Sequence, residues 1–218
     1  MKACTIEAPG HIAVGEMPDP RPAFDEVVVS VAACGVCGTD VHIYNGEMDY
    51  VEYPLIPGHE IVGIIDQIGE GVTNLKPGMR VTLDPNIPCM ECHFCRKLKF
   101  NHCLHWQGVG VSRDGGFAEK VAVPARVVYD IADMPFDVAA FTEPLSCVVY
   151  GLQRVQPSIG DRVLIFGGGP IGLLLMQSLR RAGAAQVVVT DLQQDRLDLA
   201  EELGAELTVL ADAGQAGT

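Results

Sequence analysis

Arg162-Val-Leu-Ile-Phe-Gly-Gly-Gly-Pro-Ile-Gly172 is the stretch of sequence that decides the fold of the second half of the chain. Its first five residues form an apolar run of the kind found in parallel strands buried on both faces. The glycines Gly167, Gly169 and Gly172 then fit the pattern G-x-G-x-x-G. The first permits a tight turn, the second lets a pyrophosphate approach the backbone, and the third lets the following helix pack closely. The stretch therefore predicts a strand, a phosphate-binding turn and a helix whose N-terminus faces the phosphate charge.

Strands and helices alternate on the C-terminal side of this turn. We expect, in order, a helix over Pro170–Ala182, a strand over Gln186–Thr190, a helix over Gln194–Leu203 and a strand over Glu206–Leu210. This alternation is typical of an α/β fold with a doubly wound parallel sheet, the Rossmann domain. Three strands and two helices make only the first half of such a domain. We therefore expect the 218 residues to be part of a longer chain.

Four further residues are predicted to contact the dinucleotide. Pro170 and Ile171 complete the turn, while Asp191 closes the second strand and Arg196 follows five residues later. The Asp191 carboxylate can accept hydrogen bonds from both ribose hydroxyls, whereas a 2′-phosphate would meet like charge. Arg196 tempers this preference, because its guanidinium can in principle approach a 2′-phosphate. These residues predict NAD as the cofactor, with NADP less favoured.

Four cysteines, Cys89, Cys92, Cys95 and Cys103, have the spacing C-x2-C-x2-C-x7-C within one polar loop. Thiolates of one short loop can converge on a tetrahedral metal ion, and four of them leave no position for a substrate. A closed site of this kind is typical of structural zinc. The four cysteines therefore predict a structural zinc site, and a catalytic metal has to be sought elsewhere in the chain.

Three other interpretations of the four cysteines fit less well. A disulfide framework suits small secreted domains, but the first residues do not have the pattern of a signal peptide. The bacterial ferredoxin pattern requires the fourth cysteine after three residues and then a proline, whereas here the gap is seven residues and Leu104 follows. A nucleic-acid-binding zinc finger would have basic surroundings, and this chain has a formal net charge of −13.

The composition is that of an ordinary globular protein, with 48% hydrophobic and 20% charged residues. No apolar run approaches the roughly 18 residues of a membrane span, so we expect no membrane association. The excess of 28 Asp and Glu over 15 Lys and Arg argues against nucleic acid as a partner. Eight cysteines without a secretory signal predict a reducing, cytoplasmic location.

The first part of the chain is rich in strand and turn signals. β-Branched residues predict three strands, over Glu26–Cys34, Ile61–Ile68 and Arg80–Leu83. A helix is expected over Phe136–Val155, kinked or restarted at Pro144 because proline lacks a backbone donor. We therefore place a β-rich domain at residues 1–152 and the first half of the dinucleotide-binding domain at residues 153–218.

Cysteine, histidine and carboxylate side chains outside the loop offer a second metal site. A catalytic zinc takes three protein ligands and leaves one position for water or substrate. Cys37 and His59 supply two of them, and the third comes from Glu60 or from Glu143. Asp40 is a candidate hydrogen-bond partner for the ligating His59.

These features together are similar to a known family. The motifs occur along the chain in the order Cys37–His42, Gly58–Glu60, Cys89–Cys103, Gly115–Glu119, Glu143–Cys147 and Gly167–Gly172. Their identity and order resemble zinc-dependent medium-chain alcohol dehydrogenases over essentially the whole chain. The resemblance implies a GroES-like β-rich catalytic domain followed by a Rossmann domain, with two zinc ions per chain. It also implies oxidation of a small secondary alcohol linked to NAD(P), by a homodimer or homotetramer.

The resemblance further implies roles for single residues. Thr39 takes the proton of the zinc-bound substrate hydroxyl, and His42 passes it towards solvent through the ribose. In the polyol branch of the family Glu60 is the zinc ligand and Glu143 a water-mediated partner, whereas in other branches Glu143 binds directly.

The chain resembles two branches of the family, and a third interpretation is a protein without catalytic activity. Glu143-Pro-Leu-Ser-Cys147 resembles polyol (sorbitol) dehydrogenases, although Ile43 follows His42 where animal sorbitol dehydrogenases have tyrosine. Asp40–Asn45 resembles threonine dehydrogenases, although Asn86 stands where those enzymes usually have histidine before the first loop cysteine. The third interpretation is a catalytically silent zinc-binding fragment. We expect the polyol type, with threonine oxidation as the alternative.

Overall fold

The structure is a computed structural model that describes residues 1–212. It contains two compact units, one from Met1 to Glu143 and the other from Pro144 onward. The predicted domain boundary after residue 152 falls within helix α3 (Thr142–Val155) and stays a prediction. In the described part of the chain, no helix combines the length and apolar character needed to cross a bilayer.

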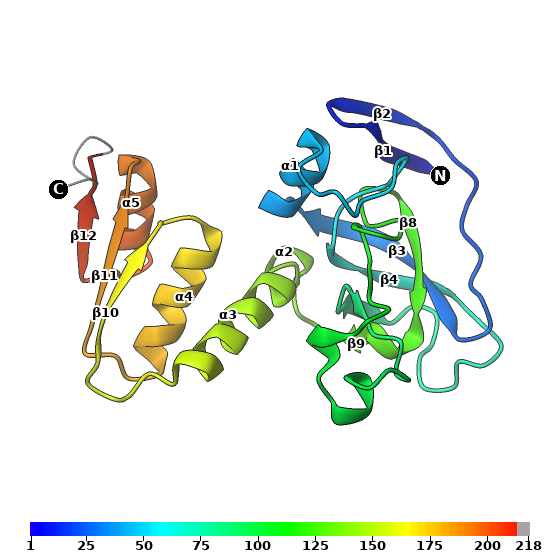
Figure 1. Ribbon diagram of the computed structural model, residues 1–218. Helices are drawn as coiled ribbons and strands as arrows, with labels where there is room; N and C mark the ends of the chain where they lie inside the picture. Colours follow the sequence, from blue (N-terminus) through cyan, green and yellow to red (C-terminus); the bar gives the residue numbers. More distant parts are fainter. Residues whose placement is uncertain (213–218) are drawn as a thin grey trace. The chain divides into compact units, whose positions relative to one another are not determined.

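The first unit is built on a five-stranded antiparallel sheet with the strand order β8-β3-β4-β5-β9 (Figure 1). Its strands are β3 (Glu26–Gly35), β4 (Glu60–Ile68), β5 (Arg80–Leu83), β8 (Lys120–Pro124) and β9 (Val128–Asp130). The three predicted strands are confirmed to within one residue at each end, and they form the middle of the sheet as β3, β4 and β5. The two edge strands, β8 and β9, were not predicted from the sequence.

Strands β3 and β4 form the core of this unit. Val27–Val29 on β3 and Ile61 and Val62 on β4 are fully buried. Successive residues of a strand point to opposite faces, so burial of consecutive positions means that both faces are covered. Burying each of these side chains contributes roughly 1.5–3 kcal/mol. Burial of the two strands therefore fixes the positions of the residues at their paired ends, Gly35 and Glu60.

Short elements surround the sheet. They are the hairpin strands β1 (Lys2–Ala8) and β2 (His11–Glu16), helix α1 (Gly38–Asn45), the strands β6 (Asn86–Ile87) and β7 (Gln107–Gly108), the 3-10 helices η1 (Cys95–Lys97), η2 (Phe100–His102) and η3 (Ala125–Val127), and helix α2 (Phe136–Ala139). The predicted helix over Phe136–Val155 is interrupted, but earlier than expected. It ends as α2 at Ala139 and restarts as α3 at Thr142. Pro144 thus lies in the first turn of α3, where no intrahelical donor is required.

The second unit contains a parallel sheet of three strands in the order β10-β11-β12. Its elements are β10 (Arg162–Phe166), α4 (Pro170–Arg181), β11 (Gln186–Asp191), α5 (Gln194–Glu202) and β12 (Leu207–Leu210). The predicted alternation of strand and helix is confirmed, with boundaries that differ by at most one residue. The two units together have the predicted fold class, a β-rich domain followed by the first half of a Rossmann domain.

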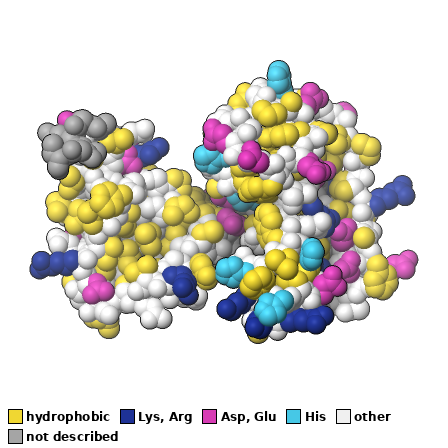
Figure 2. Space-filling view, viewed as in Figure 1, with side chains coloured by type: hydrophobic (Ala, Val, Ile, Leu, Met, Phe, Trp, Pro, Cys, Tyr) yellow, Lys and Arg dark blue, Asp and Glu magenta, His cyan; other side chains and the backbone are white. Residues whose placement is uncertain are grey.

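Helices α4 and α5 pack on the same face of the parallel sheet. One buried cluster joins side chains of both helices with Ile165, Val187 and Val189. The opposite face carries Leu164 and Phe166, of which Phe166 is 83% exposed. Figure 2 shows hydrophobic side chains, in yellow, spread over the surface of this unit. A doubly wound sheet has helices on both faces, so exposed apolar strands are expected when only its first half is present.

Candidate functional site

Asp40 connects the start of α1 with the turn before β4. Its Oδ2 atom accepts a hydrogen bond of 2.8 Å from the backbone N–H of Cys37, the N-cap of α1, and its Oδ1 accepts one of 3.0 Å from Gly58. Asp40 is only 5% exposed, and a buried carboxylate requires such partners. The two hydrogen bonds hold Cys37 close to His59, although the two residues are far apart in the sequence.

Cys37, His59 and Glu60 form a candidate metal centre. One ligand atom of each residue lies within 4.8 Å of the others. Glu60 begins β4 and pairs with Gly35, the last residue of β3. A Cβ atom at position 35 would overlap the Glu60 carboxylate, so only glycine leaves room for it there.

The chemistry of this group fits a divalent metal ion. The Nδ1 atom of His59 is buried and has no hydrogen-bond partner among the described residues. It lies 3.7 Å from the Oδ1 of Asp40, which is too long for the hydrogen bond expected between these residues. Burial raises the pKa of the Glu60 carboxyl, and a nearby cation would favour its charged form. A half-buried carboxylate, a buried histidine and a thiol are donor types that bind zinc.

A pocket of about 220 Å³ lies beside His59. It is lined by Thr39, Met48, Tyr50, His59, Pro85, Asn86, Trp106, Gly108, Val109, Val111 and Glu143. Three predicted site residues, Thr39, His59 and Glu143, are therefore on its wall. The Oγ1 atom of Thr39 lies 3.8 Å from the Sγ of Cys37. Glu60, not Glu143, is the carboxylate that groups with Cys37 and His59 within 4.8 Å.

His42 lies near the end of α1 and is largely exposed. Its Nδ1 atom is 2.5 Å from the Oε2 of Glu47. Glu47 was not predicted from the sequence, because α1 ends at Asn45 and helix periodicity says nothing about residues beyond the C-cap Gly46. Tyr50 and Trp106 in the pocket wall were not predicted either, because no motif exists for them in the sequence.

The second candidate metal centre is formed by Cys89, Cys92, Cys95 and Cys103, whose sulfur atoms lie within 4.8 Å of one another. The Sγ atoms of Cys89 and Cys95 are 4.0 Å apart. Backbone N–H groups donate to the sulfurs, including Cys92 to Cys89 at 3.4 Å and Cys89 to Cys103 at 3.3 Å. The backbone N–H groups of Cys95 and Leu104 lower the pKa of Cys92 to about 6, which favours the thiolate that a metal requires, whereas burial raises the pKa of Cys95 to about 12.

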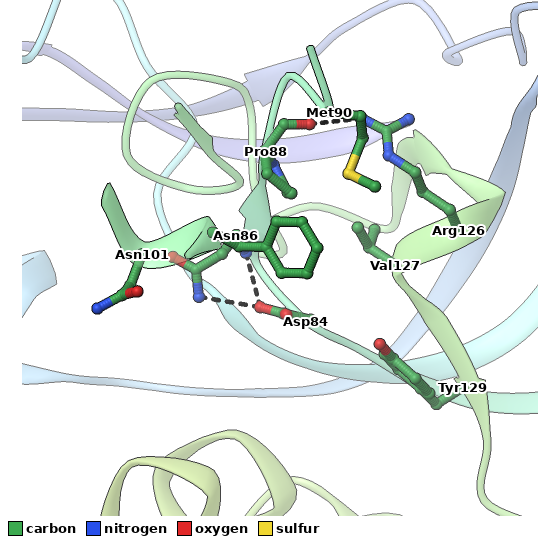
Figure 3. Close-up of a pocket in the computed structure, with 9 residues that line it drawn as sticks. Asp84, Asn86, Pro88, Met90, Asn101, Arg126, Val127 and Tyr129 are labelled. Carbon is green, nitrogen blue, oxygen red and sulfur yellow. Dashed lines mark hydrogen bonds between the residues drawn. The ribbon is translucent and has the colours of Figure 1, made fainter. Parts of the chain in front are cut away.

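Polar side chains attach the cysteine loop to the sheet around a pocket of about 390 Å³ (Figure 3). Arg126 donates a hydrogen bond of 3.2 Å to the carbonyl oxygen of Pro88, just before the first cysteine. The Asn86 side chain donates to Asp84 at 2.9 Å and accepts from the Trp106 indole N–H at 2.9 Å. Asn86 and Trp106 also line the pocket beside His59, so one pair of residues connects the loop with that pocket.

The glycine-rich turn after β10 has the geometry that its sequence predicts. Gly167 has φ of 103°, a conformation that disfavours other residues. A Cβ atom on Gly172 would overlap the carbonyl oxygen of Gly167, so α4 approaches the turn more closely than any side chain allows. A Cβ atom on Gly169 would meet nothing within 4 Å, which leaves open space at the N-cap of α4. Pro170 is the first residue of α4, where its missing N–H is not needed.

Asp191 lies at the end of β11 beside this turn. Its Oδ2 accepts a hydrogen bond of 2.7 Å from the backbone N–H of Gly168, and its Oδ1 accepts one of 2.9 Å from Gln193. Arg196 lies 3.4 Å from the same Oδ2. The hydrogen bond from Gly168 is the main cause that lowers the pKa of Asp191, and the bonds from Gln193 and Arg196 add to it. A charged carboxylate therefore stands next to the predicted phosphate-binding turn.

Comparison with protein families gives two matches along the chain. Residues 23–133 match the alcohol dehydrogenase GroES-like domain, and residues 170–216 match the zinc-binding dehydrogenase domain. The chain belongs to the zinc-binding alcohol dehydrogenase family. The resemblance inferred from the motifs is confirmed, as is the order of the two domains.

Individual relatives in the zinc-binding alcohol dehydrogenase family include both predicted branches. D-altritol 5-dehydrogenase of Agrobacterium fabrum (strain C58 / ATCC 33970) is 38% identical, with 96% of this chain and 63% of the relative covered. L-threonine 3-dehydrogenase of Anaeromyxobacter sp. (strain K) is 39% identical, with 89% and 57% covered. A zinc-binding dehydrogenase from Sinorhizobium meliloti 1021, solved bound to NADP, is 41% identical with a TM-score of 0.92, covering 95% of this chain and 61% of that one. The chain thus spans about 60% of the length of these relatives.

Proposed function

We propose that this protein transfers hydride from a secondary alcohol of the polyol class to NAD at a bound zinc ion. The observation that carries the proposal is the group of Cys37, His59 and Glu60, whose ligand atoms lie within 4.8 Å of one another. A pocket opens beside this group, and the same chain contains the glycine-rich turn of a dinucleotide-binding domain. A zinc with three protein ligands keeps a fourth position for the substrate, whereas the four-cysteine site is closed.

The chain's own residues account for the removal of the hydroxyl proton. When bound, zinc supplies the Lewis acidity that makes an alkoxide accessible near neutral pH. Thr39 lies on the pocket wall, and its hydroxyl can accept one proton while donating another. His42 then passes the proton to solvent. Glu60 is the proposed third zinc ligand because its ligand atom groups with those of Cys37 and His59. Glu143, on the pocket wall, is proposed to contact the zinc through a water molecule.

The lining of the pocket favours a polyol over threonine. Its residues include the hydroxyls of Thr39 and Tyr50, the amide of Asn86 and the carboxylate of Glu143, but no lysine or arginine. A polyol needs hydrogen-bond donors and acceptors, whereas the carboxylate of threonine would need a cation to replace its hydration. Oxidation of L-threonine stays the second candidate because relatives of that name are equally similar.

NAD is the proposed cofactor because of the charge at Asp191. A 2′-phosphate next to this carboxylate would meet repulsion, while ribose hydroxyls can donate to it. The neighbour from Sinorhizobium meliloti 1021 was solved bound to NADP, and Arg196 is the residue that would permit NADP binding here. We further propose a cytoplasmic homodimer or homotetramer. None of the eight cysteines, all of which lie in the described part of the chain, forms a disulfide, which agrees with a reducing location.

A metal count and a substrate screen on the full-length protein test the proposal. We expect two zinc ions per chain and NAD reduction with polyols. His59→Ala should lose one zinc and all turnover, while His93→Ala, a histidine of the cysteine loop, should keep both. Thr39→Ala should bind both metals and cofactor but turn over roughly 10²–10⁴-fold more slowly. One zinc per chain, with no alcohol oxidised, would instead identify a silent scaffold.

A further inference from the structure

Glu47 is held against His42 by three hydrogen bonds at the end of α1. The backbone N–H of Glu47 donates to the carbonyl oxygen of His42 at 2.9 Å, in a helix C-cap where Gly46 has φ of 73°. The Oε2 of Glu47 lies 2.5 Å from His42 Nδ1, and its Oε1 accepts a 3.0 Å hydrogen bond from the Asn45 side chain. Both carboxylate oxygens and the backbone are therefore fixed in one local arrangement.

This arrangement selects one of the two neutral forms of the His42 ring. A neutral imidazole carries its hydrogen on one nitrogen and a lone pair on the other. The Glu47 carboxylate can only accept, so the hydrogen belongs on Nδ1 and the lone pair on Nε2. His42 and Asn45 lower the pKa of Glu47, so the carboxylate remains charged at neutral pH.

We propose that Glu47 is a positioning residue of the proton path, which holds His42 as the Nδ1–H tautomer so that Nε2 is the atom that receives the substrate's proton. This inference rests on the proposed function, in which His42 carries that proton to solvent. One proton arrives at Nε2, and one proton leaves from Nδ1 to the Glu47 carboxylate and then to water. The ring is thereby returned to its neutral form with the opposite tautomer, and exchange with water restores the first.

A purely structural pair would behave differently. His42 and Glu47 have side chains 60% and 51% exposed, and exposed ion pairs contribute little to stability. A merely structural contact would set the same tautomer, but its loss would leave the rate of proton transfer and the isotope effect unchanged. The test needs readouts that depend on the position of the hydrogen.

Nitrogen-15 NMR of the imidazole rings in the zinc-loaded full-length protein, without substrate or cofactor, gives the first readout. The His42 signal is identified from its loss in His42→Gln. We expect Nδ1–H in the wild type, Nε2–H in Glu47→Ala, and Nδ1–H retained in Glu47→Gln, whose amide oxygen still accepts. Asp49→Asn, an exposed carboxyl two residues further on, is the matched control and should leave the signal unchanged.

Steady-state kinetics gives the second readout. Glu47→Ala should lower kcat about tenfold and increase the solvent deuterium isotope effect on kcat, with the KM for NAD and both zinc ions unchanged. Glu47→Gln should recover much of the rate. An active wild type with the hydrogen of His42 on Nε2, or a Glu47→Ala variant with unchanged kcat and isotope effect, overturns the role of Glu47. A wild type that oxidises no alcohol overturns the proposed function instead.

Discussion

The backbone N–H of Gly168 donates a hydrogen bond of 2.7 Å to the Oδ2 atom of Asp191. The bond joins the glycine-rich turn after β10 to the end of β11, so the carboxylate predicted to bind ribose also shapes the phosphate-binding turn. Gln193 binds the other oxygen through its backbone N–H. The shape of the turn and the recognition of the cofactor therefore both depend on the Asp191 side chain. Variants at this position have to distinguish an effect on stability from an effect on cofactor preference.

Asp191→Ser should shift the cofactor preference towards NADP. The substitution removes the negative charge that repels a 2′-phosphate and leaves Arg196 without its partner. We expect the ratio of kcat/KM for NADP to that for NAD to rise about tenfold or more. Asp191→Asn keeps an acceptor for Gly168 while removing the charge, so it should also shift the preference but with a smaller loss of thermal stability. A wild type that already prefers NADP would contradict the cofactor assignment.

Gly172→Ala should lower the stability of the protein, whereas Gly169→Ala should weaken NAD binding. A methyl group on Gly172 overlaps the backbone of Gly167, so Gly172→Ala should reduce the free energy of unfolding by about 1–3 kcal/mol. A methyl group on Gly169 would meet open space, so Gly169→Ala should change the free energy of unfolding by no more than about 0.5 kcal/mol. Gly169→Ala should nevertheless weaken NAD binding, because that space is where the pyrophosphate is predicted. Thermal unfolding and a cofactor titration compare the pair, and full NAD affinity in Gly169→Ala would exclude phosphate from this space.

Cys95→Ser should remove the structural zinc. Cys95 is buried within the four-cysteine centre, and a serine oxygen is a poor substitute for a thiolate. Because zinc binding contributes to folding, we expect one zinc fewer per chain and a melting temperature lower by roughly 5 °C or more. Cys147→Ser, at an exposed position outside the loop, is the control and should keep both metals. Full metal content and an unchanged melting temperature in Cys95→Ser would show that the loop is not a zinc site.

Asp19→Asn should destabilise the protein at neutral pH but not at low pH. Lys120 at 2.8 Å and the N-terminal amine at 2.9 Å lower the pKa of Asp19 to about 2, below its ordinary value of 3.8. Because the folded state holds the proton less tightly than the unfolded state, the stabilisation is complete above about pH 4 and is lost as the pH falls towards 2. The melting temperatures of wild type and Asp19→Asn should therefore converge as the pH falls from about 4 to about 2. Asp133→Asn, at an exposed position, is the control. If the difference in melting temperature between wild type and Asp19→Asn did not change with pH, the ion pairs of Asp19 would be ruled out as its cause.

Much of the fold follows from local sequence patterns. The β-branched run at Glu26–Cys34 predicts the central strand because consecutive buried valines suit a strand covered on both faces. The alternation after Arg162 predicts β10 to β12 and both helices to within one residue. The edge strands β8 and β9 are short, and their pairing with distant strands stabilises them more than their own residues do. No local pattern indicates such strands.

The two candidate metal centres differ in how much of each can be predicted from the sequence. The sequence alone predicts the four-cysteine centre, because its ligands belong to one loop of fifteen positions, from Cys89 to Cys103, and short chain connections keep them together. The sequence also supplies Cys37, His59 and two candidate carboxylates, but it does not choose between Glu60 and Glu143. That grouping depends on the register of β3 with β4, which puts Glu60 opposite Gly35, and on the hydrogen bonds of Asp40 to Cys37 and Gly58. Strand register and buried hydrogen bonds arise from packing between distant segments, so only the tertiary structure brings these residues to one point.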